Sequence, residues 1–351
     1  MARLNLTIDR FESAGGVLAR QSRFIEAGEA LRTRILLRVL EFMSTLLPSL
    51  GQSLASSAAE RTAGTCIVGR VQGSYVNKWG TYKVTIYYPA LQSGESTPPD
   101  RAKNPYAAVV FAHGILANKD EYKWIGNQLA SSAYVTLLFS TPNAGIRQVD
   151  QWSEGISGGI TYLNELSSSD TSILRGMVDS ARIGAMGHSM GGAAAILATV
   201  NDSRIKSTVA LAPANPRHVP PASRKALEAA KAVKVPVQIQ VGSKDGLTPK
   251  DTVHEYYANL PGVAAKEYVE IKGGGHLRFT DIGTRLLGIL DPGATLSLDR
   301  EHEISQSFFT AWFQYFLRGD VTFEPYLFGA RARNALESGA LSALEWVKAW
   351  D

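Results

Sequence analysis

Cysteine is almost absent from this sequence. Cys66 is the only one in 351 residues, so the chain cannot form an internal disulfide, a thiolate metal site or a pair of redox thiols. This excludes the class of secreted proteins that many disulfides hold together. Motifs of the H-E-x-x-H type and paired His/Asp clusters are also missing, as is a glycine loop that could cradle phosphate. We therefore expect neither a metal nor a cofactor.

Charge of one sign is lacking as well. The chain has 36 basic and 32 acidic residues, a formal net charge of +4, and both signs are scattered along its length. It contains neither a basic run nor a cluster of basic and aromatic residues. The sequence therefore does not favour a nucleic-acid partner.

The third absence is a long hydrophobic run. The most apolar stretch, residues 31–50, contains Arg32, Arg34, Arg38 and Glu41 and so does not fit a membrane-spanning helix. It begins too late for an ordinary secretory signal, and the acidic residues before it do not fit a transit peptide. We expect the protein in the cytoplasm or at the periphery of a membrane, with export as the alternative.

Residues 1–64 have helical spacing without a strand pattern, and they end in a small, polar stretch typical of a linker. Arg34, Arg38 and Glu41 fall on one face of a helix and leave the apolar side chains on the other. We expect that apolar face to pack against its own domain or a second subunit. Contact with a membrane surface is the alternative, because basic amphipathic helices suit both.

Short β-rich runs alternate with helical ones between residues 65 and 320. Several runs, such as AAVVFA and TVALA, are continuously apolar, which is typical of parallel strands that helices cover on both faces. The alternation predicts an α/β fold, with a mostly parallel, doubly wound sheet of about eight strands. We expect strands at residues 81–88, 107–112, 135–140, 182–186, 206–211, 236–241 and 266–271, and helices at 150–166, 249–260 and 303–317.

Beyond residue 320, Leu336, Ala340, Leu344 and Val347 recur at helical spacing. They predict a docked amphipathic helix over residues 330–350. The chain thus divides into a helical extension with a linker (1–64), an α/β domain (65–320) and a C-terminal helical extension (321–351).

The sequence Gly187-His188-Ser189-Met190-Gly191 stands between a strand-like run, RIGAM, and a helix former, GAAAILATV. The bare motif G-x-S-x-G is common, so its position between strand and helix is what counts. A sharp turn there strains the serine backbone and raises its side chain above the sheet, while the glycines allow close approach. The N-terminus of the next helix favours negative charge nearby. The motif predicts an α/β-hydrolase fold with Ser189 as nucleophile.

A serine nucleophile needs a base and a third group that orients the base, and in this fold they follow in the order acid, then histidine. Asp245 follows the predicted strand 236–241, and His276 follows the strand 266–271 and a run of three glycines. We predict His276 as general base and Asp245 as the orienting acid. Asp251 is the alternative acid, but it falls inside a predicted helix.

The other histidines fit less well. His188 is next to the nucleophile but points away from it by the geometry of the turn, and His113 is better placed for packing. The oxyanion of acyl transfer also needs backbone N–H donors, one after the nucleophile and one after an earlier strand. We predict that Met190 and Ile115 supply them. The remaining histidines lie in a Pro-rich loop or on predicted helices: His218, His254 and His302.

Five passages in order resemble the family of bacterial cutinases, lipases and polyester hydrolases, which includes poly(ethylene terephthalate) hydrolases. They are KWIGNQLAS, VDSARIGAMGHSMGG, SKDGLTP, EIKGGGH and WFQYFLRGD, and the similarity spans about residues 75–320. The resemblance implies a triad of Ser189, Asp245 and His276 and an oxyanion hole at Ile115 and Met190. It also implies hydrolysis of carboxylic esters, from short acyl esters to glycerides and polyesters, without a metal.

The chain departs from this family at two positions near the predicted site. An aromatic residue is usual at the position of Ile115, and a tryptophan is common near that of Ala214; their loss argues against binding of aromatic polyesters. The family's carboxy-terminal disulfide cannot form with one cysteine. Residues 213–235 have room for a short helix, about 222–233, but not for a large lid domain, so we expect a fairly open site.

Two other functions compete with ester hydrolysis. The same triad could act on a lactone, thioester or peptide. Alternatively, the chain could be a catalytically silent α/β-hydrolase that binds partners through its terminal helices. The intact set of Ser189, Asp245 and His276 argues against a silent protein, which has no chemical need to keep all three.

Overall fold

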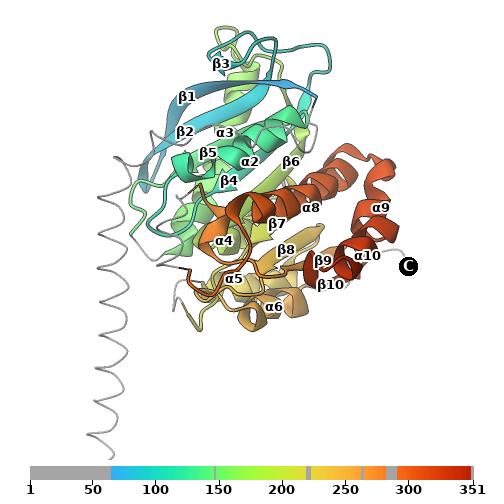
Figure 1. Cartoon of the computed structure of the whole chain (residues 1–351). Coiled ribbons are helices and arrows are strands. Elements are labelled where there is room, and N and C mark those ends of the chain that lie inside the picture. Colours follow the sequence, from blue (N-terminus) through green and yellow to red (C-terminus); the bar gives the residue numbers. More distant parts are fainter. Residues whose placement is uncertain (1–64, 146–147, 219–222, 262–264, 282–290, 349–351) are drawn as a thin grey trace, which may run out of the picture. The chain divides into compact units, whose positions relative to one another are not determined.

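The computed structural model describes residues 65–145, 148–218, 223–261, 265–281 and 291–348. The predicted helical extension of residues 1–64 lies outside these ranges and stays a prediction. In the part described, a mostly parallel sheet of ten strands is flanked by helices, as expected for an α/β-hydrolase (Figure 1). None of the described helices is both long and apolar enough to cross a bilayer.

The strands of the sheet lie in the order β10-β9-β8-β7-β6-β4-β5-β2-β1-β3. Those from β5 through β9 in this order are parallel, whereas β2 joins β5, and β10 joins β9, in antiparallel pairs. The strands are β1 (Ile67–Asn77), β2 (Gly80–Ala90), β3 (Gly94–Glu95), β4 (Tyr106–Ala112), β5 (Val135–Ser140), β6 (Val178–His188), β7 (Ile205–Leu211), β8 (Val237–Gly242), β9 (Lys266–Ile271) and β10 (Leu341–Val347).

Helices alternate with the strands along the chain, as predicted. The ranges predicted for strands and helices overlap the observed elements and differ from them by a few residues at the ends. The α-helices are α2 (Lys123–Ser131), α3 (Val149–Ser168), α4 (Met190–Asn201), α5 (Arg224–Ala229), α6 (Lys250–Asn259), α8 (Leu298–Arg318), α9 (Glu324–Leu327) and α10 (Ala330–Glu337). The 3-10 helices are η1 (Lys119–Tyr122), η2 (Ala230–Ala232), η3 (Leu277–Phe279) and η4 (Val321–Phe323).

The apolar strands bury both of their faces, which explains their continuous hydrophobic runs. All seven residues of β4 are buried, and successive side chains of a strand point to opposite faces. Val110 packs in a core with α3 and α4, whereas Val109 and Phe111 pack in a second core with α2 and α8. The sheet is thus rigidly covered on both sides, which fixes the strand ends that carry the site.

Ten strands are present where about eight were predicted, and β1 is among those missed. In β1 only Gly69 is buried, and the other positions alternate between exposed and half-buried. A strand with so little buried surface leaves no apolar run in the sequence.

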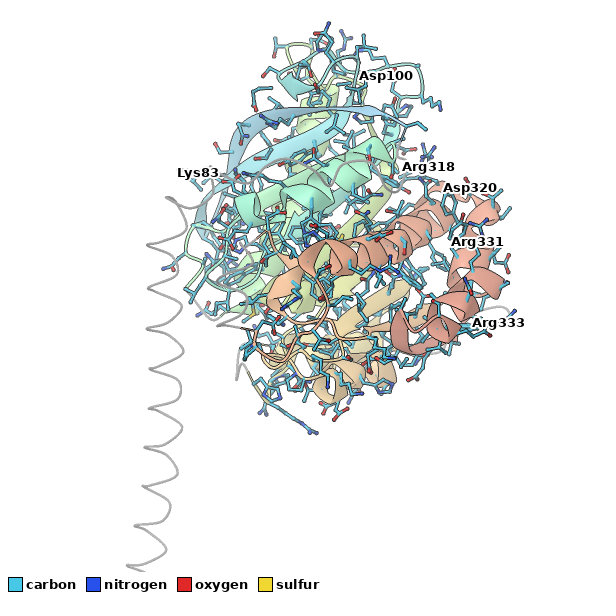
Figure 2. The ribbon with its side chains drawn as sticks, in the orientation of Figure 1. Lys83, Asp100, Arg318, Asp320, Arg331 and Arg333 are labelled. Atoms are coloured by element: carbon cyan, nitrogen blue, oxygen red, sulfur yellow. The ribbon has the colours of Figure 1, made fainter. Side chains whose placement is uncertain are left out.

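The predicted C-terminal helix over residues 330–350 is wrong in its second half. The helix α10 buries Ala332 and directs Arg331 and Arg333 outward (Figure 2). It ends before Gly339, whose φ of +77° is a left-handed conformation that glycine favours. Residues 341–347 then pair with β9 as an edge strand. Over so short a length, their apolar spacing fits both the period of a helix and that of a strand. Pairing with the open edge of β9 favours the strand.

Candidate active site

Ser189 lies between the end of β6 and the start of α4, in the strained turn that the sequence predicts. Its φ of 55° is unusual for a residue with a side chain. The surrounding backbone holds it there, because its N–H donates to Leu211 O at 2.9 Å and its carbonyl accepts from Ala193 N and Ala214 N. The helix α4 thus begins directly after Ser189.

The two glycines of the motif are required by close backbone packing. A Cβ atom on Gly187 would lie 2.2 Å from Gly191 O, and one on Gly191 would lie 2.1 Å from Ala112 O. A side chain at Gly187 would clash with the start of α4, and one at Gly191 would push the turn away from the end of β4. The steric reason proposed from the sequence is therefore confirmed.

Asp245 follows β8 and has a full set of hydrogen-bond partners. Its Oδ1 accepts from Leu247 N at 2.9 Å and Thr248 N at 2.7 Å. Its Oδ2 accepts from Thr248 Oγ1 and from His276 Nδ1, both at 2.8 Å. The alternative acid, Asp251, is exposed on α6. The carboxylate of Asp245 is thus fixed to face one imidazole nitrogen.

His276 follows β9 and is 3% exposed. Since Nδ1 donates to Asp245, the other ring nitrogen, Nε2, keeps a free lone pair. Burial alone would lower the pKa of His276, but the charge and hydrogen bond of Asp245, together with the charge of Asp291, raise it above its ordinary value of 6.5. The residue is thus built to take up a proton.

Ser189 and His276 reach the same edge of the sheet, since each follows the carboxyl end of a parallel strand. The imidazole rings of His188 and His276 are 4.6 Å apart, so His276 lies directly beside the nucleophile turn. Within the described ranges, Ser189 Oγ and His276 make no direct hydrogen bond. Such bonds are often long until substrate binds.

His188 and His113 are both buried and hydrogen-bonded beside the site, and His113 packs as expected. Buried His188 bonds through Nδ1 to Tyr122 Oη at 2.9 Å, and burial, followed by the nearby His276, lowers its pKa well below 6.5. His113 donates from Nδ1 to Gly114 O and accepts from Thr141 N. Its burial lowers its pKa to about 4. Both side chains are therefore favoured in the neutral form and are held by hydrogen bonds within the protein.

The predicted oxyanion donors lie on either side of the nucleophile. Met190 is the first residue of α4, where N–H groups lack partners within the helix. Ile115 follows Gly114, and a Cβ atom on that glycine would lie 3.3 Å from Ser189 Cβ. In the ranges that the structure covers, neither Met190 N nor Ile115 N donates to a protein acceptor. Both N–H groups are thus available to a ligand beside Ser189.

Tyr122 was not singled out by the sequence analysis, yet it joins these two segments. Its oxygen accepts from Gly114 N at 3.1 Å and shares a hydrogen bond of 2.9 Å with His188 Nδ1. It therefore ties the loop that carries Ile115 to the turn that carries Ser189. No local motif marks it, because its partner His188 is 66 residues away in sequence.

A cavity of about 350 Å³ lies away from this site, near the C-terminal end of α2 and the middle of α8. Its lining includes Cys66, Lys103 and Arg318 but none of the residues described above. This cavity therefore does not mark the reactive region, which the strand ends and the hydrogen bonds identify instead.

Comparison with known proteins agrees with this geometry. A model of the PET hydrolase-like family matches residues 50–340. Cutinase 2 of Thermobifida cellulosilytica is 26% identical over 263 residues, which cover 69% of this chain and 90% of that protein. Bis(hydroxyethyl) terephthalate hydrolase of Streptomyces coelicolor is 25% identical over 278 residues, which cover 79% and 76%. Cutinase cut1 of Thermobifida fusca is 26% identical over 263 residues, which cover 69% and 74%.

These relatives are ester hydrolases, and they favour neither the alternative substrates nor a silent binding protein. The family match extends over most of the chain, across the whole segment that carries Ser189, Asp245 and His276. This chain therefore belongs to the PET hydrolase-like family of α/β-hydrolases and is a serine hydrolase of carboxylic esters.

Proposed function

We propose that Ser189 is the nucleophile of this esterase, that His276 is its general base and that Asp245 orients His276. The observation that carries the assignment is the buried 2.8 Å hydrogen bond from His276 Nδ1 to Asp245 Oδ2. It leaves Nε2 free on the residue beside the strained nucleophile turn. We further propose that Ile115 N and Met190 N form the oxyanion hole.

The reaction then proceeds in two steps. His276 Nε2 takes the proton from Ser189 Oγ as the oxygen attacks the ester carbonyl carbon, and the N–H groups of Ile115 and Met190 stabilise the oxyanion. The C–O bond to the alcohol breaks, the alcohol leaves with the proton from His276, and an acyl-serine remains. Water, deprotonated by His276, attacks the acyl carbon. The C–O bond to Ser189 Oγ then breaks, the serine oxygen takes the proton back from His276, and the acid is released.

The substrate we propose is an ester with a bulky, aliphatic acyl or alcohol group. Only α5 and η2 are described between β7 and β8, which argues for an open site. Ile115 is half-buried against the core, and Ala214 is fully buried with its carbonyl bonded to Tyr256 Oη. Neither position offers a ring on which a terephthalate unit could stack.

Covalent labelling tests the nucleophile, and a substrate series tests the ester. A fluorophosphonate probe should modify Ser189, as read by mass spectrometry of the digested protein, and should not react with His276→Ala. Labelling at another serine would contradict the assignment. Hydrolysis of an aliphatic polyester film should exceed that of poly(ethylene terephthalate); equal or reversed rates would contradict the proposed preference.

The ester is the partner that the relatives support. Association of residues 31–50 with a membrane or a second subunit, and a cytoplasmic or membrane-peripheral location, stay predictions from the sequence. Sedimentation of the full chain with anionic vesicles, and its mass by light scattering, distinguish a membrane contact from self-association.

A further inference from the structure

Two buried carboxyl groups outside the proposed triad hold the backbone on both sides of His276. Gly275 N, just before the histidine, donates to Glu301 Oε2 at 3.0 Å. Leu277 N, just after it, donates to Asp291 Oδ2 at 3.1 Å. Glu301 lies in the first turn of α8, and Asp291 precedes that helix. The peptide groups flanking His276 are thus fixed by α8 on one side and by the segment before that helix on the other.

The glycines before His276 make this approach possible. A Cβ atom on Gly275 would lie 2.0 Å from Asp291 Oδ2, and one on Gly274 would lie 3.0 Å from the carboxyl atoms of Glu301. A side chain at Gly275 would displace Asp291, and one at Gly274 would crowd the carboxyl group of Glu301. The run of glycines therefore does more than provide flexibility: it lets two carboxyl groups pack directly on the backbone.

The surroundings of the two acids differ. Asp291 is 2% exposed, and burial raises its pKa above the ordinary value. The neighbouring His276, the N–H of Leu277 and the guanidinium of Arg278 at 3.5 Å act in the opposite direction and favour the anion. Glu301 is fully buried, and its Oε1 has no hydrogen-bond partner among the described residues. No cation is bonded to it there, and burial raises its pKa well above the ordinary value. An uncompensated buried charge would be costly, so Glu301 is favoured in the neutral form.

We propose that Asp291 and Glu301 are positioning residues for His276, with different roles. Asp291 acts as an anion that fixes the loop and stabilises the protonated imidazole, whereas Glu301 acts as a neutral acid that fixes the loop by hydrogen bonding. The proposal rests on the proposed role of His276 as general base. The groups that surround the imidazole and its loop are Asp245, His188, Asp291, Arg278 and Glu301.

Substitutions that keep shape but change charge separate the two roles. Asp291→Asn keeps an oxygen that can accept from Leu277 N but removes the charge. Without that charge the pKa of His276 should fall, so the midpoint of the acid limb in the kcat/KM profile should move about half a pH unit to lower pH. We expect kcat to fall roughly tenfold and KM to change little. A titration of the His276 ring by NMR should show the same fall in its pKa, independently of activity.

Glu301→Gln keeps a neutral acceptor and should retain kcat within about threefold across the pH range, whereas Glu301→Leu leaves Gly275 N without its acceptor and should lose about tenfold or more. If Glu301→Gln is as impaired as Glu301→Leu, a neutral role is wrong. If Glu301→Leu does not fold, Glu301→Gln still tests the neutral role of Glu301 and Asp291→Asn still tests the charge role of Asp291.

An unchanged acid limb in Asp291→Asn would overturn the charge role, whatever its effect on stability. Ser189→Ala and His276→Ala, measured in parallel, identify which idea fails. If both keep activity, the proposed function is wrong; if both lose it and Asp291→Asn has the wild-type profile, only the present inference is wrong.

Discussion

Replacing Tyr122 by phenylalanine removes one oxygen atom and tests how the two halves of the site are joined. The hydroxyl is fully buried between Gly114 N and His188 Nδ1, at 3.1 and 2.9 Å. Phenylalanine fills the same space but leaves both polar groups without a partner. Each such group costs about 1–3 kcal/mol, so the free energy of unfolding should fall by roughly 2–6 kcal/mol.

The activity of Tyr122→Phe should fall as well, because Gly114 precedes the proposed oxyanion donor Ile115. Losing an oxyanion donor costs on the order of 100-fold or more in kcat. In this variant the donor Ile115 N stays but is held less firmly, so we expect kcat to fall about tenfold with KM little changed. Urea unfolding and p-nitrophenyl butyrate kinetics measure the two effects.

Tyr88→Phe is the matched control. Tyr88 Oη donates to Thr97 O at 2.8 Å, away from the site, so its loss should cost about 1 kcal/mol and leave kcat unchanged. If the two variants lose the same stability and neither loses activity, Tyr122 does not join the site and the reasoning is refuted.

Three further predictions concern titration and packing. Since His276 must be neutral to act, kcat/KM should rise with pH through a pKa above 6.5, and a midpoint below this value would contradict the raised pKa. The raised pKa of His276 should also stabilise the folded protein. This contribution should be fully present below pH 6.5, the ordinary pKa, and should be lost as pH rises through the pKa of the folded state. His113, with a folded pKa of about 4, should contribute a loss of about 3 kcal/mol of stability as pH falls from 6.5 to 4; urea unfolding of His113→Asn should show a correspondingly smaller fall, and equal falls would contradict it. Gly191→Ala places a Cβ atom 2.1 Å from Ala112 O, so it should destabilise by about 3 kcal/mol or more, and a wild-type melting temperature would show that the turn can relax.

The sequence is most informative where local pattern and burial coincide. Continuous apolar runs such as those of β4 and β7 predict strands that helices cover on both faces, and such a cover is observed. The largely exposed strand β1 and the C-terminal edge strand β10 leave no such run. Their place depends on pairing with β2 and β9, which a local pattern does not record.

The candidate site divides in the same way. Ser189, Asp245 and His276 each follow a strand within a short motif, so local sequence and chain order suffice to propose them. Tyr122 and Glu301 act through contacts that only the folded chain creates. A buried glutamate in an amphipathic helix resembles a surface residue until the loop it contacts is known.

The central claim is that Ser189 is the nucleophile, and ester hydrolysis by wild type and Ser189→Ala tests it most directly. The assay is a series of p-nitrophenyl esters from short to long acyl chains, with folding of both proteins checked by circular dichroism. We expect wild type to turn over and the variant to lose about a thousandfold or more in rate on every ester. Comparable rates for the two proteins would contradict the account.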